Sequence, residues 1–294
     1  MIGWGETFAL ASALGWALAV VLMRRIGETL PAFELNLFKN SLGMLLLVPT
    51  ILLVNGLEVP GYSLYELAVV FASGVIGIAV ADTWYLRALN LMGAGRAAIV
   101  ASLFSPFVIM LSMIFLGERM VPWQWLGVFL VISGVLMVTW RVQYSSIDPK
   151  DIRKGAILGV AAVFMMALGI VLVKESLEAR PLLWTMELRL AGGVAGMLAY
   201  TWVKGQWQSV RRNFQRPQPW PGIIGASFLA AYLALILWLA GYKLLDASVA
   251  SILNQTNVVF ILLLAWLMLG EQITRRKLAG IVLTIGGVLI MVLV

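Results

Sequence analysis

The sequence predicts an all-α integral membrane protein whose ten transmembrane helices form two inverted five-helix repeats. The first observation is composition: 62% of the 294 residues are hydrophobic and 12% are charged, which leaves too little polar surface to enclose a soluble globule. The second is duplication, because residues 95–138 recur 153 places later and the motif Leu-Gly-Glu at 116–118 returns at 269–271. The third is the alternation of basic and non-basic loops, which gives the two halves opposite orientations.

The apolar stretches have the length of membrane-spanning helices, since about 20 helical residues cross the roughly 30 Å hydrocarbon core. They are continuous, unlike the alternating pattern of a barrel strand. The first stretch follows Glu6 and precedes Arg24, so it is interpreted as a retained helix rather than a secretion signal. We expect helices at about residues 5–23, 32–54, 66–87, 94–116, 121–140, 155–174, 182–203, 221–243, 247–269 and 275–293.

The two halves also match near their beginnings. At a shift of 150 residues, Pro31 falls on Pro181 and Lys39 on Arg189. We therefore predict a first five-helix repeat at residues 1–143, a basic linker at 144–154 and a second repeat at 155–294. Because five is odd, the second repeat enters the membrane upside down relative to the first.

The distribution of cations predicts the orientation. Fifteen of the 21 Lys and Arg residues lie in the loops that follow odd-numbered helices, and four lie in the other loops. Cytoplasmic loops carry the excess of Lys and Arg. We therefore expect the odd-numbered loops in the cytoplasm and both termini outside, in the inner membrane of a bacterium. The cations alternate with apolar runs, so no nucleic-acid partner is expected.

The absence of two residue types excludes several kinds of chemistry. The chain contains neither Cys nor His, which removes thiol nucleophiles, imidazole-ligated zinc and Ser-His-Asp triads. We expect no metal and no cofactor, and any proton carrier must be a carboxylate, Lys or Tyr. No Walker sequence is present. An enzyme is not expected, although an intramembrane enzyme stays as the alternative from another functional class.

The duplicated motifs resemble a known superfamily. Each repeat closes with a Leu-Gly-Glu turn followed by two glycines seven residues apart, Gly127 with Gly134 and Gly280 with Gly287. This pattern resembles the ten-helix, EamA-type members of the drug/metabolite transporter superfamily, over nearly the whole chain. The resemblance implies transport of amino acids or other small metabolites, with export as the expected direction. Residues 82–89 are similar to the third-helix pattern of bacterial aromatic amino acid exporters, in which a polar residue and an aromatic three places on face the cavity.

Two cations within the helices are the first candidate site residues. Burying an ionised side chain in a membrane helix costs about 2.5–3.5 kcal/mol on insertion scales, so such groups are usually functional. Lys39 and Arg189 occupy equivalent places in the two repeats. They suit a substrate carboxylate or phosphate. The alternative is neutralisation by a nearby acid: Asp82 for Lys39, and Glu187 or Glu175 for Arg189.

Two carboxylates are candidates for proton coupling. Asp82 lies at a depth where it could meet Lys39, and Tyr85 shares its helix face. An unpaired Asp82 could carry a proton, whereas an Asp82 held in an ion pair could not. Glu187 cannot pair with Arg189 within one helix, and it is the second proton-coupling candidate.

The remaining candidates are polar and aromatic groups. Asn254 and Gln255 belong to an unusually polar run in the ninth helix, and the repeat matches Gln255 to Ser102. Amides in hydrocarbon must find partners, so they line a cavity or pack against other helices. Trp16 and Tyr242 could contact an aromatic side chain or an organic ammonium.

We expect a secondary transporter that moves an amino acid-like compound by alternating access, as a monomer or homodimer, with protons as possible partners. The alternative within transport is a carrier of quaternary ammonium or other cationic compounds. Glu118 and Glu271, in the two turns, are expected to stabilise the amino terminus of the next helix.

Overall fold

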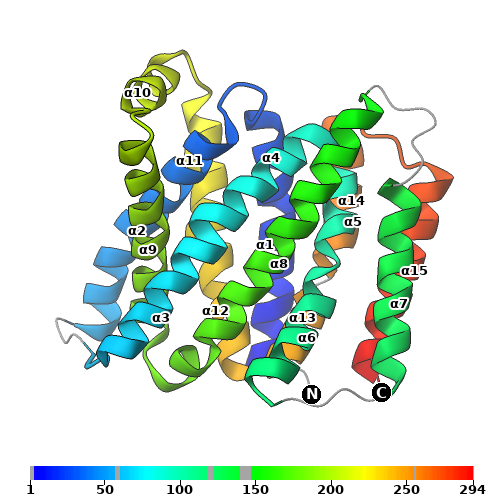
Figure 1. Cartoon of the computed structure of the whole chain (residues 1–294), viewed down its shortest axis with the longest axis horizontal. Helices are drawn as coiled ribbons and strands as arrows, with labels where there is room; N and C mark the ends of the chain where they lie inside the picture. Colours follow the sequence, from blue (N-terminus) through cyan, green and yellow to red (C-terminus); the bar gives the residue numbers. More distant parts are fainter. Residues whose placement is uncertain (1–2, 57–59, 118–121, 140–146, 255, 294) are drawn as a thin grey trace.

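The computed structural model describes residues 3–56, 60–117, 122–139, 147–254 and 256–293, and all regular structure in these ranges is helical (Figure 1). The first half contains α1 (Trp4–Ile26), α2 (Ala32–Asn55), α3 (Leu64–Gly74), η1 (Val75–Asp82), α4 (Thr83–Met92), α5 (Ala94–Ala101), α6 (Phe104–Phe115) and α7 (Pro122–Thr139). The second half contains α8 (Pro149–Ala179), α9 (Leu182–Val203), α10 (Trp207–Gln215), α11 (Trp220–Phe228), η2 (Leu229–Leu233), α12 (Ala234–Leu244), α13 (Ala247–Asn254), α14 (Thr256–Leu269) and α15 (Arg275–Leu293).

In the part of the chain that the structure describes, each of the ten expected segments is mainly helical. Within the described ranges, eight helical stretches are long and apolar enough to cross a membrane. The helices α7 and α15, with 18 and 19 residues, complete the ten, because spanning helices range from about 17 to 25 residues. Some crossings comprise consecutive pieces, of which α3, η1 and α4 form one continuous helix over residues 64–92. The predicted fold class is confirmed.

The packing follows the pseudo-two-fold symmetry that inverted repeats create. In the first half, α1 packs against α12 and α14 of the second half. The equivalent helix α8 packs against α4 and α6 of the first half. The pairs α2 with α9 and α7 with α15 join equivalent helices to each other. The first helix of each half therefore packs among the helices of the other half, and the centre of the molecule lies between the repeats.

Three features were not expected from the sequence. The helix α8 begins at Pro149, inside the segment predicted as a linker, because Asp148 caps it by accepting a hydrogen bond from the Lys150 amide at 2.7 Å. The short helix α10 occupies the loop between the seventh and eighth crossings. The π-helical segments η1 and η2 interrupt the third and eighth crossings at equivalent places, since Val75 moved 153 places is Phe228, next to Leu229.

Glu271 caps a different helix from the one expected. Its carboxylate accepts hydrogen bonds from the backbone amides of Ala94 at 2.7 Å and Gly95 at 3.0 Å, and from Lys277 Nζ at 3.1 Å. The capped helix is α5, from the other half, rather than α15, which follows Glu271 in the chain. A carboxylate at a helix amino terminus offsets the positive end of the helix dipole, so this contact joins the repeats. Glu118 lies outside the described residues.

Close backbone contacts hold the π-helical segments against the neighbouring half. A Cβ atom added to Gly74, just before η1, would lie 2.0 Å from the carbonyl oxygen of Arg189 on α9. A Cβ atom on Gly43 of α2 would lie 2.6 Å from the carbonyl oxygen of Ala231 in η2. Only glycine permits such an approach between membrane helices. These two contacts pack η1 against α9 of the second half and η2 against α2 of the first half.

The orientation in the membrane stays a prediction. Gly61 is exposed just before α3, and Ser209 is exposed on α10, beyond the opposite ends of the crossings. Because the chain has no native cysteine, Gly61→Cys and Ser209→Cys can be labelled one at a time. In intact cells we expect a membrane-impermeant maleimide to label the Gly61→Cys variant, and to label Ser209→Cys only after permeabilisation. The reverse pattern contradicts the orientation drawn from the loop charges.

Candidate functional site

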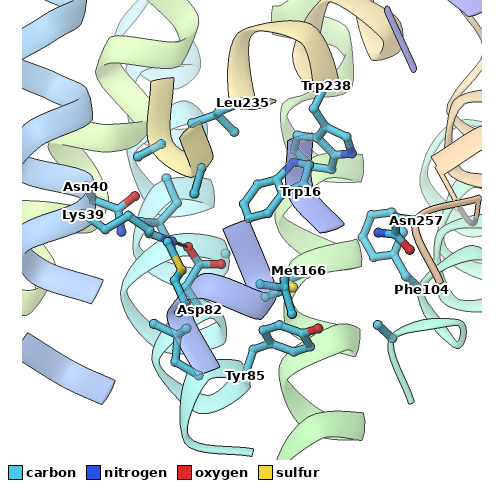
Figure 2. Close-up of a pocket in the computed structure, with 18 of the residues that line it drawn as sticks. Trp16, Lys39, Asn40, Asp82, Tyr85, Phe104, Met166, Leu235, Trp238 and Asn257 are labelled. Carbon is cyan, nitrogen blue, oxygen red and sulfur yellow. Dashed lines mark hydrogen bonds and ion pairs between the residues drawn. The ribbon is translucent and has the colours of Figure 1, made fainter. Parts of the chain in front are cut away.

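A cavity of about 160 Å³ lies between the two repeats. Its walls come from both halves. Residues of the lining belong to α1, α2, η1, α4, α5 and α6 in the first half and to α8, α9, η2, α12, α13 and α14 in the second half. Cavities of about this size hold a small organic molecule. Figure 2 shows aromatic side chains and the polar groups of Lys39, Asp82, Asn40 and Asn257 around the same space.

The lining is arranged in pairs that the repeat relates. For nine of the twelve first-half lining residues, a move of 150 or 153 places gives a lining residue of the second half. The pairs are Trp16 with Met166, Lys39 with Arg189, Gly77 with Ala230, Ile78 with Ala231, Asp82 with Leu235, Tyr85 with Trp238, Leu86 with Leu239, Ala101 with Asn254, and Phe104 with Asn257. The cavity therefore lies on the pseudo-two-fold axis, where transporters with inverted repeats bind substrate.

Lys39 and Asp82 form an ion pair in the cavity wall (Figure 2). Lys39 is 3% exposed and Asp82 is 16% exposed, so neither side chain is fully hydrated. Lys39 Nζ also lies 6.0 Å from the centroid of the Trp16 ring, within range of a cation–π attraction. Of the two interpretations of Lys39, the structure thus has the one in which Asp82 neutralises it. The cation comes from α2, and the carboxylate comes from the end of η1.

An amide network fixes η1 beside this pair. Asn36 Nδ2 donates to the carbonyl oxygen of Ile78 at 2.8 Å and to Thr83 Oγ1 at 2.9 Å. Asn40 Nδ2 donates to Asn36 Oδ1 at 2.7 Å. A π-helical segment weakens the regular backbone ladder and is frequent at functional sites, and a buried amide can satisfy a carbonyl group there. The network thus holds Asp82 at a fixed height opposite Lys39.

Arg189 is the second cation of the cavity, and it is 5% exposed. Its Nε atom is buried and has no hydrogen-bond partner among the described residues. A guanidinium nitrogen lies 3.4 Å from the position that a Cβ atom would take on Gly77, so the absence of a side chain there leaves room for it. Asp82, the carboxylate of the ion pair with Lys39, lines the same cavity. The lining therefore holds two cations and one carboxylate, a surplus of one positive charge.

Most of the site residues predicted from the sequence line the cavity, and the others lie elsewhere. Lys39, Asp82, Arg189, Trp16, Tyr85 and Asn254 line the cavity. Asn254 Oδ1 accepts a hydrogen bond from Ser12 Oγ at 3.0 Å, which ties α13 to α1.

Three predicted residues lie outside the lining. Ser102 is fully buried between α5 and α6. Tyr242 is fully buried one turn beyond Trp238, with the two ring centroids 4.9 Å apart. Glu187 is partly buried on α9, and its Oε2 atom has no hydrogen-bond partner among the described residues. Gln255 lies outside the described residues.

The sequence reasoning missed Asn40, Met166 and Asn257 as lining residues. A signal existed for each. Asn36 and Asn40 stand four residues apart next to Lys39, Met166 is the repeat partner of Trp16, and Asn257 lies in the same polar run as Asn254. In the part of the chain that the structure covers, no group of three His, Cys, Asp or Glu side chains is arranged to hold a metal ion.

Comparison with known proteins places the chain in a family. The model of the EamA-like transporter family matches residues 3–140 and 153–293. The pseudopaline exporter CntI of two Pseudomonas aeruginosa strains is 29% identical over 142 residues, 48% of this chain and 48% of that protein. The chain thus matches about half the length of these curated relatives.

A second relative and a solved structure extend over more of the chain. An uncharacterized transporter of Archaeoglobus fulgidus is 26% identical over 231 residues, 77% of this chain and 78% of that protein. A crystal structure with 18% sequence identity superposes with a TM-score of 0.70 over 98% of this chain and 96% of that chain, which is a likeness of fold. The two family matches, one in each half, show that the chain, whose described residues include eight helices long and apolar enough to cross a membrane, belongs to the EamA-like transporter family.

Proposed function

We propose that the protein exports a small amino acid-like metabolite, and that the carboxylate of this substrate binds at Arg189. The observation that carries the proposal is the surplus positive charge of the cavity. Asp82 is engaged by Lys39, whereas Arg189 Nε has no partner among the described residues. Arg189 forms no ion pair among the described residues. Burying such a cation is costly, and a substrate carboxylate offsets that cost by accepting charge-assisted hydrogen bonds.

The apolar part of the substrate is expected to lie among the rings. Trp16, Tyr85, Phe104 and Trp238 contribute to the cavity wall. Aromatic faces stabilise apolar and aromatic groups through buried area and ring stacking. The amides of Asn254 and Asn257, on the second-half side of the wall, are suited to hydrogen-bond the polar end of an amino acid. Large apolar and aromatic amino acids are therefore the expected substrates.

Alternating access follows from the symmetry of the two halves. Inverted repeats exchange roles when one half rocks against the other, so each half can expose the central site to one side of the membrane. The π-helical segments η1 and η2 and the break between α5 and α6 lie beside the cavity, where a helix can bend with little loss of hydrogen bonds. The relative that is named as an exporter supports the outward direction. We place the protein in a bacterial inner membrane.

The cationic alternative has less support in the cavity. A quaternary ammonium compound would need Asp82 as its counter-ion, but Lys39 already forms an ion pair with Asp82. It would also have to enter a site with two buried cations. Repulsion between like charges in a poorly hydrated site disfavours such a ligand.

A cysteine in the cavity wall tests the proposal. In Met166→Cys, the new thiol faces the space between the repeats (Figure 2), and the chain has no native cysteine. We expect a mixture of L-phenylalanine, L-leucine and L-methionine to slow alkylation of this thiol severalfold, because a bound ligand excludes the reagent. Choline and ethidium are expected to give no protection. Equal or better protection by the cations supports the alternative function and contradicts ours.

A control separates binding in the cavity from general effects on the protein. Ser209→Cys carries its thiol on α10, outside the cavity. Its alkylation rate is expected to stay the same with amino acids and with cations. The two variants are compared in the same detergent, with amides of the three amino acids as a further ligand set. Protection by the amides as strong as protection by the acids removes the role given to the carboxylate.

A further inference from the structure

Four cations surround the short helix α10 and have no role in the cavity. Lys204, Arg211, Arg212 and Arg216 are all exposed. Residues 204–216 contain no Asp or Glu, and none of the four cations forms an ion pair within the described part of the chain. We call these four residues the α10 cation cluster.

The chain on both sides forces α10 to the level of the lipid headgroups. Trp202 and Val203, at the end of α9, are each 74% exposed, as expected for side chains in contact with lipid. The next crossing begins with α11 at Trp220. The 16 residues 204–219 join two membrane crossings, and Trp residues such as Trp202, Trp207 and Trp220 are enriched at the membrane interface. Figure 1 shows α10 lying across the ends of its neighbours rather than along them.

The helix is amphipathic, and its apolar side is held by the protein. Val210 is 6% exposed, whereas Trp207, one turn earlier, is 46% exposed. The Phe214 ring stacks on Trp220 with centroids 6.3 Å apart, and it lies 6.4 Å from the ring of Phe38 on α2. The apolar stripe thus faces the bundle and the interface. The exposed cations, rather than the apolar side, are therefore the part of the helix that can attract anionic lipid.

A hydrogen bond fixes α10 to the helix that carries Lys39. Asn213 Nδ2 donates to Glu34 Oε1 at 2.6 Å, and Glu34 is 6% exposed. Glu34 is buried, and it forms no ion pair with the four cations among the described residues. The α10 cation cluster is therefore a preformed surface and not a flexible loop.

We infer that the α10 cation cluster binds the headgroups of anionic phospholipids. The phosphate of such a lipid supplies the negative charge that the cluster lacks within the protein, and arginine can bind phosphate oxygens with two hydrogen bonds. The acyl chains of the same lipid would pack beside the exposed Trp202 and Val203. Zwitterionic lipids also carry a phosphate, but their ammonium group cancels its charge, so they are expected to be bound less well.

Selective quenching tests this inference without a transport substrate. A fluorophore is attached to the Ser209→Cys variant, which is placed in phosphatidylcholine vesicles that contain phosphatidylglycerol. A small fraction of nitroxide-labelled lipid is added, either phosphatidylglycerol or phosphatidylcholine with the same acyl chains. We expect the labelled phosphatidylglycerol to quench about twofold more strongly. In 1 M salt, where screening acts over about 3 Å, this excess is expected to fall.

Matched variants identify the residues responsible. Arg211→Gln/Arg212→Gln/Arg216→Gln is expected to lose the excess quenching. Arg153→Gln/Lys154→Gln removes two exposed cations from the start of α8 and is expected to keep it. The triple substitution to lysine retains the charges, so it keeps most of the excess and shows that the fold is intact. Equal quenching by both lipids in the parent, or an excess that survives the triple glutamine substitution, overturns the inference.

Discussion

Asp82→Asn is expected to destabilise the folded protein by about 3–5 kcal/mol, because it leaves Lys39 as an unpaired cation in a site where that residue is 3% exposed. The free energy of unfolding falls because the charge of Lys39 stays buried without a counter-ion, as well as because the attraction between Lys39 and Asp82 is lost. Reversible unfolding in mixed micelles measures the free energy. Lys39→Met and the double variant Lys39→Met/Asp82→Asn complete a cycle, in which the double variant is expected to recover most of the stability.

An exposed ion pair provides the control. Arg24 and Glu28 form a pair at 3.4 Å on the surface, with Glu28 64% exposed. Glu28→Gln is expected to cost about 0.2–0.5 kcal/mol, since water replaces the lost contact. If Asp82→Asn costs as little as Glu28→Gln, the Lys39–Asp82 pair is not buried in the membrane-embedded protein.

The same variant tests proton coupling. With Asp82 held in the ion pair, its replacement is not expected to abolish the dependence of transport on a pH gradient, although it lowers the rate. Glu187, whose Oε2 atom is buried without a partner among the described residues, is the other candidate. Transport measured across a pH series for Asp82→Asn and Glu187→Gln separates the two carboxylates. A pH dependence lost only in Asp82→Asn assigns the proton to Asp82.

The architecture of the molecule could be predicted because its causes act over long stretches of sequence. A membrane helix needs about 20 apolar residues whatever its neighbours are, so the ten crossings were visible. Duplication at a shift of 150 residues paired Lys39 with Arg189, and the structure brings both residues to one cavity. The inversion required by five helices per repeat placed that cavity between the halves.

The interior of the site could not be predicted with the same rules. In the π-helical segment η1, the carbonyl oxygen of Ile78 accepts a hydrogen bond from Asn36. This contact joins two helices and has no local sequence signature. Tyr242 was expected in the site because it is aromatic and lies on the eighth crossing. It stands one helical turn, about 5.4 Å, beyond Trp238, and the cavity ends between them. Sequence spacing gives the face of a helix but not the depth at which a cavity closes.

Arg189→Met is expected to reduce the affinity for an amino acid by about 10-fold to 150-fold, which corresponds to the roughly 1.5–3 kcal/mol of a hydrogen bond to a charged group. Unlike Asp82→Asn, it removes a buried cation that has no hydrogen-bond partner at Nε within the described residues. The folded protein is therefore expected to be as stable as the parent or more stable. Arg189→Met is thus expected to lower the affinity without lowering the stability, a trade-off that is common at binding sites.

Arg189→Lys separates charge from shape. Lysine keeps the positive charge but lacks the planar fork that binds a carboxylate with two hydrogen bonds. Its affinity is expected to fall between those of the parent and Arg189→Met. An Arg189→Lys variant that binds no better than Arg189→Met indicates that the geometry of the guanidinium group, and not its charge, provides the binding energy.

The most direct test of the carboxylate site compares L-phenylalanine with L-phenylalaninamide by titration calorimetry on purified protein. The two ligands share the ring and the amino group and differ in the carboxylate. We predict that the parent protein binds the acid at least about tenfold more tightly than the amide, and that Arg189→Met binds the two nearly equally. A parent that binds the amide as tightly as the acid, or an Arg189→Met variant that keeps the preference, contradicts the account.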